Sequence, residues 1–120
     1  MRIFIFLTVF CLIPLNVFAQ DIDIMTIDIQ GGFDDNNVTL FVNGVYIWSS
    51  DSVKSDNIID FVESLRVPLY AGSDRYIKVI VDGAEFSSEI TDKTIKFIGI
   101  QRTEDKTIEF NLSKQAFFYD

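Results

Sequence analysis

The chain has 120 residues, no histidine, a single cysteine and a formal net charge of −8. Without histidine, Ser-His-Asp and Cys-His catalysis and the usual zinc sites are excluded. The acidic balance argues against nucleic-acid binding, because such proteins need a basic patch to contact phosphate.

The N-terminal segment has the layout of a cleavable secretory signal peptide. Arg2 provides a positive start, residues 3–13 are almost continuously apolar, and Val17-Phe18-Ala19 places small residues at positions −3 and −1 of a cleavage site. The apolar run is shorter than the roughly 20 residues that a membrane-spanning helix needs. We therefore expect residues 1–19 to be removed near Ala19–Gln20, giving a secreted or periplasmic protein with no membrane span after cleavage.

Cleavage changes the chemistry of the chain. The mature protein, residues 20–120, loses Arg2 and so has a formal charge of −9 instead of −8. It also loses Cys11, the only thiol, so no disulfide can form within it. We expect a single domain that is stabilised by one hydrophobic core, because a chain of this size buries enough surface to fold without cross-links.

The mature sequence begins with the period-two alternation of a half-buried strand. Ile22 and Ile24 alternate with aspartates, and Ile27 and Ile29 continue the alternation in a shifted phase. This phase change predicts a β-bulge near Met25–Thr26.

The next segment is a hairpin. Two alternating runs, 38–42 and 45–50, flank Asn43-Gly44, and Asn-Gly between such runs is the strongest short-range hairpin signal. A two-residue loop also fixes the register, and it leaves aliphatic side chains on one face as the core candidate. The predicted register pairs Phe41 with Tyr46, Leu40 with Ile47 and Thr39 with Trp48.

The opposite face of this hairpin is the candidate contact site. It carries Phe41, Tyr46 and Trp48 in the predicted register, and aromatic rings on a sheet can stack on sugars or anchor a protein partner. The alternative is that this face is covered, either by the aromatic tail at residues 117–119 or by Phe61.

The remaining elements follow from turn residues and alternation. About seven or eight short strands at regular spacing predict an all-β, antiparallel β-sandwich of immunoglobulin-like type, with a small β-barrel as the alternative. The predicted segments are a loop at 49–57, a loop or single helical turn to Phe61, an edge strand to Leu69 that contains Pro68, a hairpin at 76–90 around Asp82-Gly83, and a strand pair at 94–101 and 107–112.

Three short polar patterns carry weaker predictions. The Asp34–Asn37 run offers oxygen ligands for calcium but lacks the spacing of an EF-hand, so a solvated turn is the favoured interpretation and no metal site or cofactor is predicted. Asn37 begins an Asn37-Val38-Thr39 N-glycosylation pattern. Ser52, in a predicted loop, lies in Asp51-Ser52-Val53, which resembles a short bacterial O-glycosylation sequence.

These observations favour a protein that is not an enzyme. The leading hypothesis is an exported binding or interaction module, whose partner is an unknown protein or carbohydrate of the cell envelope. The first alternative is an assembly subunit that uses the edge strand near Leu65–Leu69 or the aromatic tail at 116–120. The second alternative is an acidic inhibitor of a cationic hydrolase, steered to its target by charge.

Overall fold

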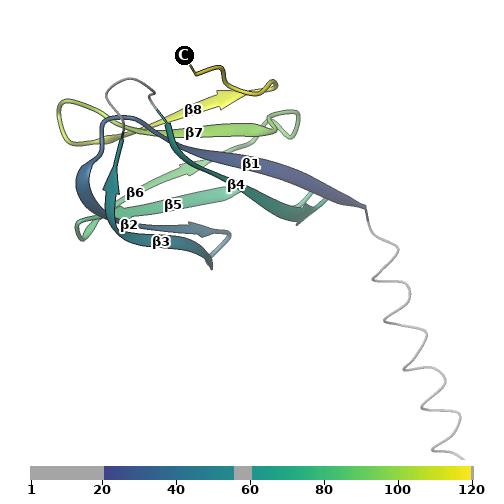
Figure 1. Cartoon of the computed structure of the whole chain (residues 1–120). Helices are drawn as coiled ribbons and strands as arrows, with labels where there is room; N and C mark the ends of the chain where they lie inside the picture. The colour runs from purple at the N-terminus through teal and green to yellow at the C-terminus, as the bar shows by residue number, and fades with distance from the viewer. Residues whose placement is uncertain (1–20, 56–60, 120) are drawn as a thin grey trace, which may run out of the picture.

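The computed structural model describes residues 21–55 and 61–119. Within these ranges the chain forms eight β-strands and no helix (Figure 1). The predicted signal peptide and its cleavage site lie outside the described residues. In chain order the strands are β1 (Ile22–Gln30), β2 (Asp34–Val42), β3 (Val45–Lys54), β4 (Phe61–Tyr70), β5 (Tyr76–Val81), β6 (Ala84–Glu89), β7 (Phe97–Arg102) and β8 (Ile108–Ser113).

The strands form two separate four-stranded sheets. Sheet A has the order β4-β1-β7-β8, and sheet B has the order β3-β2-β5-β6. Figure 1 shows the two sheets as two layers, with β1, β7 and β8 in one and β2, β3 and β5 in the other. The all-β prediction is confirmed. The described strands do not close into a barrel, so the small-barrel alternative is wrong.

The core lies between the two sheets and is built by their central strands. Each central strand places an aliphatic side chain inward at every second position, as the period of a β-strand requires. Burying one such side chain contributes about 1.5–3 kcal/mol to the free energy of unfolding. The buried residues of these strands are Met25, Ile27 and Ile29 of β1, Val38, Leu40 and Val42 of β2, Ile77, Val79 and Val81 of β5, and Ile98 and Ile100 of β7.

One strand pair departs from the predicted antiparallel arrangement. β1 runs parallel to β7, with Thr26 opposite Phe97 and Ile29 opposite Ile100. The other five pairs are antiparallel. Alternation predicts that a segment is a strand, but it does not indicate in which direction the strand runs relative to its neighbours. No hairpin joins β1 to β7, so their relative direction could not be predicted from a turn.

The two predicted two-residue turns are confirmed. Asn43 and Gly44 have φ angles of 51° and 79°, and Asp82 and Gly83 have 49° and 86°. These positive values are the ones that a type I′ turn needs at both central positions. The strands pair directly outside each turn, from Val42–Val45 in the first hairpin and Val81–Ala84 in the second.

The register of the first hairpin shifts after its second pair, which the sequence did not predict. Trp48, rather than Ile47, lies opposite Leu40, so Ile47 is the extra residue of a β-bulge. The predicted pairing of Trp48 with Thr39 is therefore wrong. The bulge brings Trp48 to the same side as Ile47, so both side chains face the core and are half-buried.

The bulge predicted within β1 is also wrong. The register of β1 with β4 is regular from Ile22 to Ile29, and it shifts only at Gln30. Ile22 and Ile24 instead have the phase opposite to that of the core residues of β1, and they are 53% and 39% exposed. The phase change in the sequence thus marks exposed apolar residues, and not an inserted residue.

β4 is the predicted edge strand. It lies at the edge of sheet A, pairs with β1 alone among the described strands, and contains Pro68. Val67 is buried, while Leu65 and Leu69 are half-buried against the core, as predicted. The predicted helical turn before Phe61 falls mainly on residues 56–60, which lie outside the described residues.

Candidate functional site

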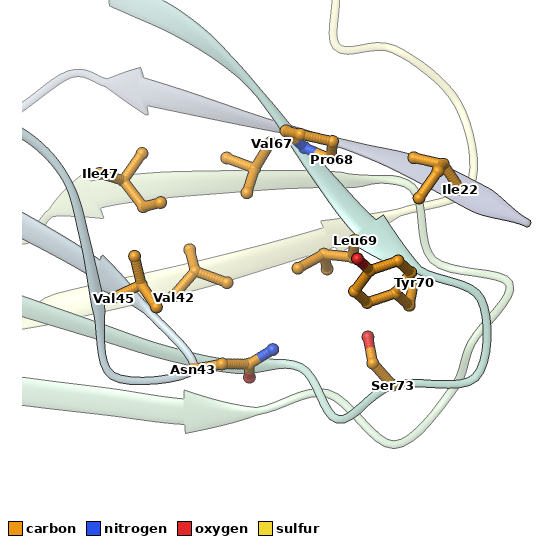
Figure 2. A pocket seen from close by; sticks show the side chains of 10 residues that line it. All are labelled: Ile22, Val42, Asn43, Val45, Ile47, Val67, Pro68, Leu69, Tyr70 and Ser73. Carbon is orange, nitrogen blue, oxygen red and sulfur yellow. The ribbon is translucent and has the colours of Figure 1, made fainter. Parts of the chain in front are cut away.

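An apolar cleft opens between the edge strands of the two sheets. β3 is the edge of sheet B and β4 is the edge of sheet A, and residues of both strands line a cavity of about 390 Å³ (Figure 2). Ile22, Val45 and Tyr70 are each more than half exposed at this cleft. The lining residues are Ile22, Val42, Asn43, Val45, Ile47, Val67, Pro68, Leu69, Tyr70 and Ser73.

The walls of the cleft follow from the local structure of each edge strand. On β3, alternation turns both Val45 and Ile47 inward, and both line the cleft. On β4, alternation turns Val67 and Leu69 inward. Figure 2 shows these two side chains pointing from β4 into the space between the sheets. The buried Val42 connects the cleft to the core.

Two polar side chains stand at one end of the cleft. Asn43 uses both ends of its amide: Nδ2 donates to the carbonyl oxygen of Asp74 at 2.6 Å, and Oδ1 accepts from the backbone N–H of Tyr76 at 2.8 Å. Ser73 differs, because its Oγ is buried and has no hydrogen-bond partner within the described part of the chain. In Figure 2 the Ser73 hydroxyl points toward the space beside Tyr70.

Ionic contacts hold the backbone next to this end. Arg75, two residues after Ser73, is 1% exposed, and its Nη2 lies 3.0 Å from Oδ2 of Asp23. Its Nη1 donates to the carbonyl oxygen of Ile95 at 2.8 Å. Lys96 lies 3.3 Å from the other oxygen of Asp23. The arginine thereby links β1 to the segments before β5 and before β7.

The three aromatic residues predicted as contacts do not form one surface. Phe41 and Tyr46 lie together on the outer face of sheet B, with ring centroids 6.2 Å apart and ring planes at 78°. The ammonium of Lys78 lies 4.6 Å from the Phe41 centroid. Trp48 is on the core side of the same sheet because of the bulge. Two rings at right angles give no flat platform on which one sugar ring could stack.

The aromatic tail covers a different face from the one expected. The Tyr119 ring packs against Phe61 at 4.9 Å between centroids, and its hydroxyl donates to Oδ2 of Asp28 at 2.8 Å. Both contacts belong to sheet A, so the prediction that the tail or Phe61 covers Tyr46 and Phe41 is wrong. Phe118, between the anchored residues, is 94% exposed.

Under the tail lies a buried polar network that sequence reasoning missed. Gln30 accepts a hydrogen bond from Nδ2 of Asn111 at 2.9 Å and donates one to the Tyr119 hydroxyl at 3.0 Å. Ser64 donates to Oδ1 of Asp28 at 2.7 Å. Asp28 and Gln30 are 7% and 6% exposed. The one available signal was the phase of these two polar residues, which alternate with Ile27 and Ile29 on β1.

The Asp34–Asn37 run begins strand β2, so the predicted solvated turn is wrong. The run is hydrogen-bonded to Asp82, in the turn between β5 and β6. Oδ1 of Asp82 accepts from the backbone N–H of Asn37 at 2.8 Å, and Oδ2 accepts from Nδ2 of Asn36 at 2.6 Å. These two bonds, the first more than the second, lower the pKa of the Asp82 carboxyl. The described residues contain no group of three acidic, histidine or cysteine side chains that could hold a metal ion.

The two candidate glycosylation residues are exposed on strands. Ser52 lies on β3, because that strand extends to Lys54 and replaces much of the predicted loop; its hydroxyl donates to Oδ1 of Asp35. Asn37 lies on β2, and its Nδ2 donates to Asp51 at 3.3 Å. Modification of either residue stays a prediction.

Comparison with protein families, with curated proteins and with solved structures finds no match to this chain. Among the described residues there is no helix of the length and apolarity that a membrane span needs.

Proposed function

We propose that this chain is an exported, non-catalytic binding module that recognises an apolar partner of the cell envelope in the cleft between β3 and β4. One observation carries the proposal: the two sheets separate at this edge and leave apolar side chains from both in contact with water. Exposed apolar surface of this kind usually marks an interaction site, because burying it in a partner is favourable.

The dimensions and lining of the cleft support this function. Small-molecule sites typically enclose about 300–1,000 Å³, lined mainly by hydrophobic side chains with a few polar groups. A cavity of about 390 Å³ with eight apolar lining residues and only Asn43 and Ser73 as uncharged polar neighbours matches that description at its small end. Catalysis has no comparable support, since the chain lacks histidine.

The cellular setting of the proposal comes from the sequence. A signal peptide at residues 1–19 would deliver the protein to the periplasm or the exterior, where envelope components are its neighbours. The immunoglobulin-like topology is part of the same proposal. It is supported by the two four-stranded sheets, by the hairpins β2–β3, β5–β6 and β7–β8, and by the pairing of β1 with β7.

A second candidate function is favoured by a separate observation. Phe118 is 94% exposed, although the tail on either side of it is held in place. An aromatic side chain presented on anchored backbone can serve as a contact to another subunit, as the assembly hypothesis requires. The acidic-inhibitor hypothesis stays a prediction from net charge.

The proposal can be tested with two neighbouring substitutions on β3. Val45 and Tyr46 are 61% and 57% exposed, but only Val45 lines the cleft. The full chain, purified from the compartment it reaches, should retain envelope extract components on a column. Val45→Asp should abolish retention and Tyr46→Asp should preserve it. The reverse result would assign recognition to the aromatic face, and equal retention by both variants would exclude the cleft.

A further inference from the structure

The two strands that border the cleft both carry features that oppose pairing with an added strand. β3 has its bulge at Ile47, β4 has Pro68, and both residues line the cleft. A bulge twists an edge strand out of a regular ladder, and proline has no N–H to donate to one. An occupant that binds through backbone hydrogen bonds is therefore disfavoured, and an occupant that fills the cleft with hydrocarbon is favoured.

One end of the cleft offers a hydrogen bond. Burying a hydroxyl without a partner is unfavourable, so the unbonded Oγ of Ser73 is a position where a ligand oxygen would lower the free energy. Asn43 already has a partner at both ends of its amide, in Asp74 and Tyr76, whereas the Ser73 hydroxyl has none among the described residues. The polar group of the ligand is thus expected at Ser73.

A cation lies next to the same residue. The Nζ of Lys93 donates to the carbonyl oxygen of Ser73, and the Lys93 side chain is exposed. Arg75 and Lys96, by contrast, both contact Asp23. The exposed ammonium group of Lys93 is therefore better able than Arg75 or Lys96 to attract an anionic head group.

Acidic residues near Ser73 limit the negative charge that a bound head group can carry. Asp74 and Asp21 are exposed and adjoin the cleft through backbone bonds to Asn43 and Ala71. Asp92 precedes Lys93 in the chain. Each additional negative charge on a ligand would be repelled by these carboxylates, so a head group with one negative charge fits better than one with two.

We propose that the cleft binds a single-chain amphiphile, with its alkyl chain between β3 and β4 and a singly charged anionic head group at Ser73 and Lys93. This inference deepens the proposed function and rests on it. A free fatty acid has this chemistry, and so does one acyl chain of an anionic membrane lipid; an added β-strand or a sugar does not.

The chain contains a built-in reporter for the test. Trp48 is its only tryptophan, and it adjoins Ile47 of the cleft wall. Titration of the full chain with dodecanoate should give a saturable change in Trp48 fluorescence. Val45→Asp should abolish the saturable change, while Tyr46→Asp, on the other face of the same strand, should leave the dissociation constant unchanged.

Two further substitutions test the head group. Ser73→Ala should weaken dodecanoate binding about tenfold, as expected for a hydrogen bond to a charged group. The same substitution should not lower the free energy of unfolding, because the hydroxyl has no partner in the free protein. Lys93→Gln should weaken binding of dodecanoate several-fold and leave binding of the neutral dodecyl maltoside unchanged. Equal effects on both probes would contradict the charge assignment.

The source of the ligand is distinguished by a second probe. Phosphatidylglycerol vesicles present acyl chains with singly charged head groups in a membrane, and dodecanoate presents one alkyl chain with one negative charge in solution. Saturable binding of dodecanoate supports the inference whether or not vesicles also bind. Vesicle binding that survives Val45→Asp, with no dodecanoate binding, would assign the protein to the membrane surface and overturn it.

Failure of this inference can be separated from failure of the proposed function. If no alkyl probe binds but Val45→Asp still abolishes retention of envelope components, the cleft is a recognition site for another class of partner. If the mass in ultracentrifugation rises with concentration, and both Val45→Asp and Phe118→Ala prevent the rise, a second copy occupies the cleft. Either outcome contradicts the proposal that the cleft binds an amphiphile. Both proposals fail only if Val45→Asp changes neither dodecanoate binding nor the retention of envelope components.

Discussion

The tail-covered face of sheet A and the cleft between β3 and β4 handle buried polar groups in opposite ways. Beneath the tail, both carboxylate oxygens of Asp28 and both amide atoms of Gln30 have partners. At the cleft, the Ser73 hydroxyl is buried without a partner, and apolar side chains such as Val45 stay in contact with water. The polar groups of the first region have partners within the chain, and we propose that a ligand supplies the partner in the second. Stability and recognition therefore depend on different residues.

The largest expected effect is on stability, in the tail-covered face. A side chain at Gly99 would overlap the Gln30 amide. Gly99→Val should displace that amide from Asn111 and Tyr119, and so lower the free energy of unfolding by about 3 kcal/mol, measured in urea. In a Gln30→Ala background the same substitution should cost much less. An unchanged cost there would mean that Gly99 is required for another reason.

The next effect tests the tail itself. Tyr119→Phe removes the hydroxyl that joins Asp28 to Gln30 and leaves two buried groups without this partner. The free energy of unfolding should fall by about 1–2 kcal/mol. Tyr46→Phe is the matched control, because its hydroxyl bonds to Ser49 at an exposed position. Equal losses in the two variants would contradict the contrast between buried and exposed hydroxyls.

At the cleft we expect a substitution to have a large effect on binding and a small effect on stability. Val45 is already 61% exposed, so Val45→Asp should change the free energy of unfolding by less than about 0.5 kcal/mol while removing binding. Urea unfolding and fluorescence titration of one preparation give both quantities. A loss of several kcal/mol would show that Val45 serves the fold, and the region would then resemble the tail-covered face.

The smallest effect concerns pH and the turn next to the core. Hydrogen bonds from Asn37 and Asn36 lower the pKa of Asp82 in the folded chain. Stability from this carboxylate is complete above the unfolded pKa of about 3.9, and is lost as the pH falls through the lower folded value. Acidification from about pH 5 to about pH 3 should therefore destabilise the wild type more than Asp82→Asn. Identical pH profiles in thermal unfolding would contradict this linkage.

A second aspartate variant distinguishes the contribution of Asp82 from a general sensitivity of the fold to acid. Hydrogen bonds from the hydroxyl and the backbone N–H of Thr94 lower the pKa of Asp92 in the same direction. Asp92→Asn should also reduce the destabilisation at low pH, and the double variant should show both reductions, because the two sites are far apart in the fold and share no partner.

The sequence predicts local features of this fold well. Asn43-Gly44 and Asp82-Gly83 need positive φ angles in a fixed pattern, so short-range chemistry alone determines those turns. Pro68 correctly predicts an edge strand, because a central strand would need its missing N–H.

Features that depend on distant contacts were not predictable in the same way. The bulge at Ile47 lets two adjacent side chains reach the core, and this depends on the opposite sheet and not on β3 alone. It also removes Trp48 from the predicted aromatic site. Likewise, Tyr119 reaches Asp28 across 91 positions of sequence, and no local pattern connects them. The cleft arises only where the edges of two sheets meet, so neither strand indicates it alone.

The most direct test of the account is a two-dimensional amide NMR titration of the full chain with dodecanoate. We expect saturable shifts at residues that line the cleft on both sheets, including Val45, Val67 and Ser73, with little change at Phe41 and Lys78 on the outer face of sheet B. Shifts confined to that outer face, or to the tail around Phe118, would contradict the assignment of recognition to the cleft.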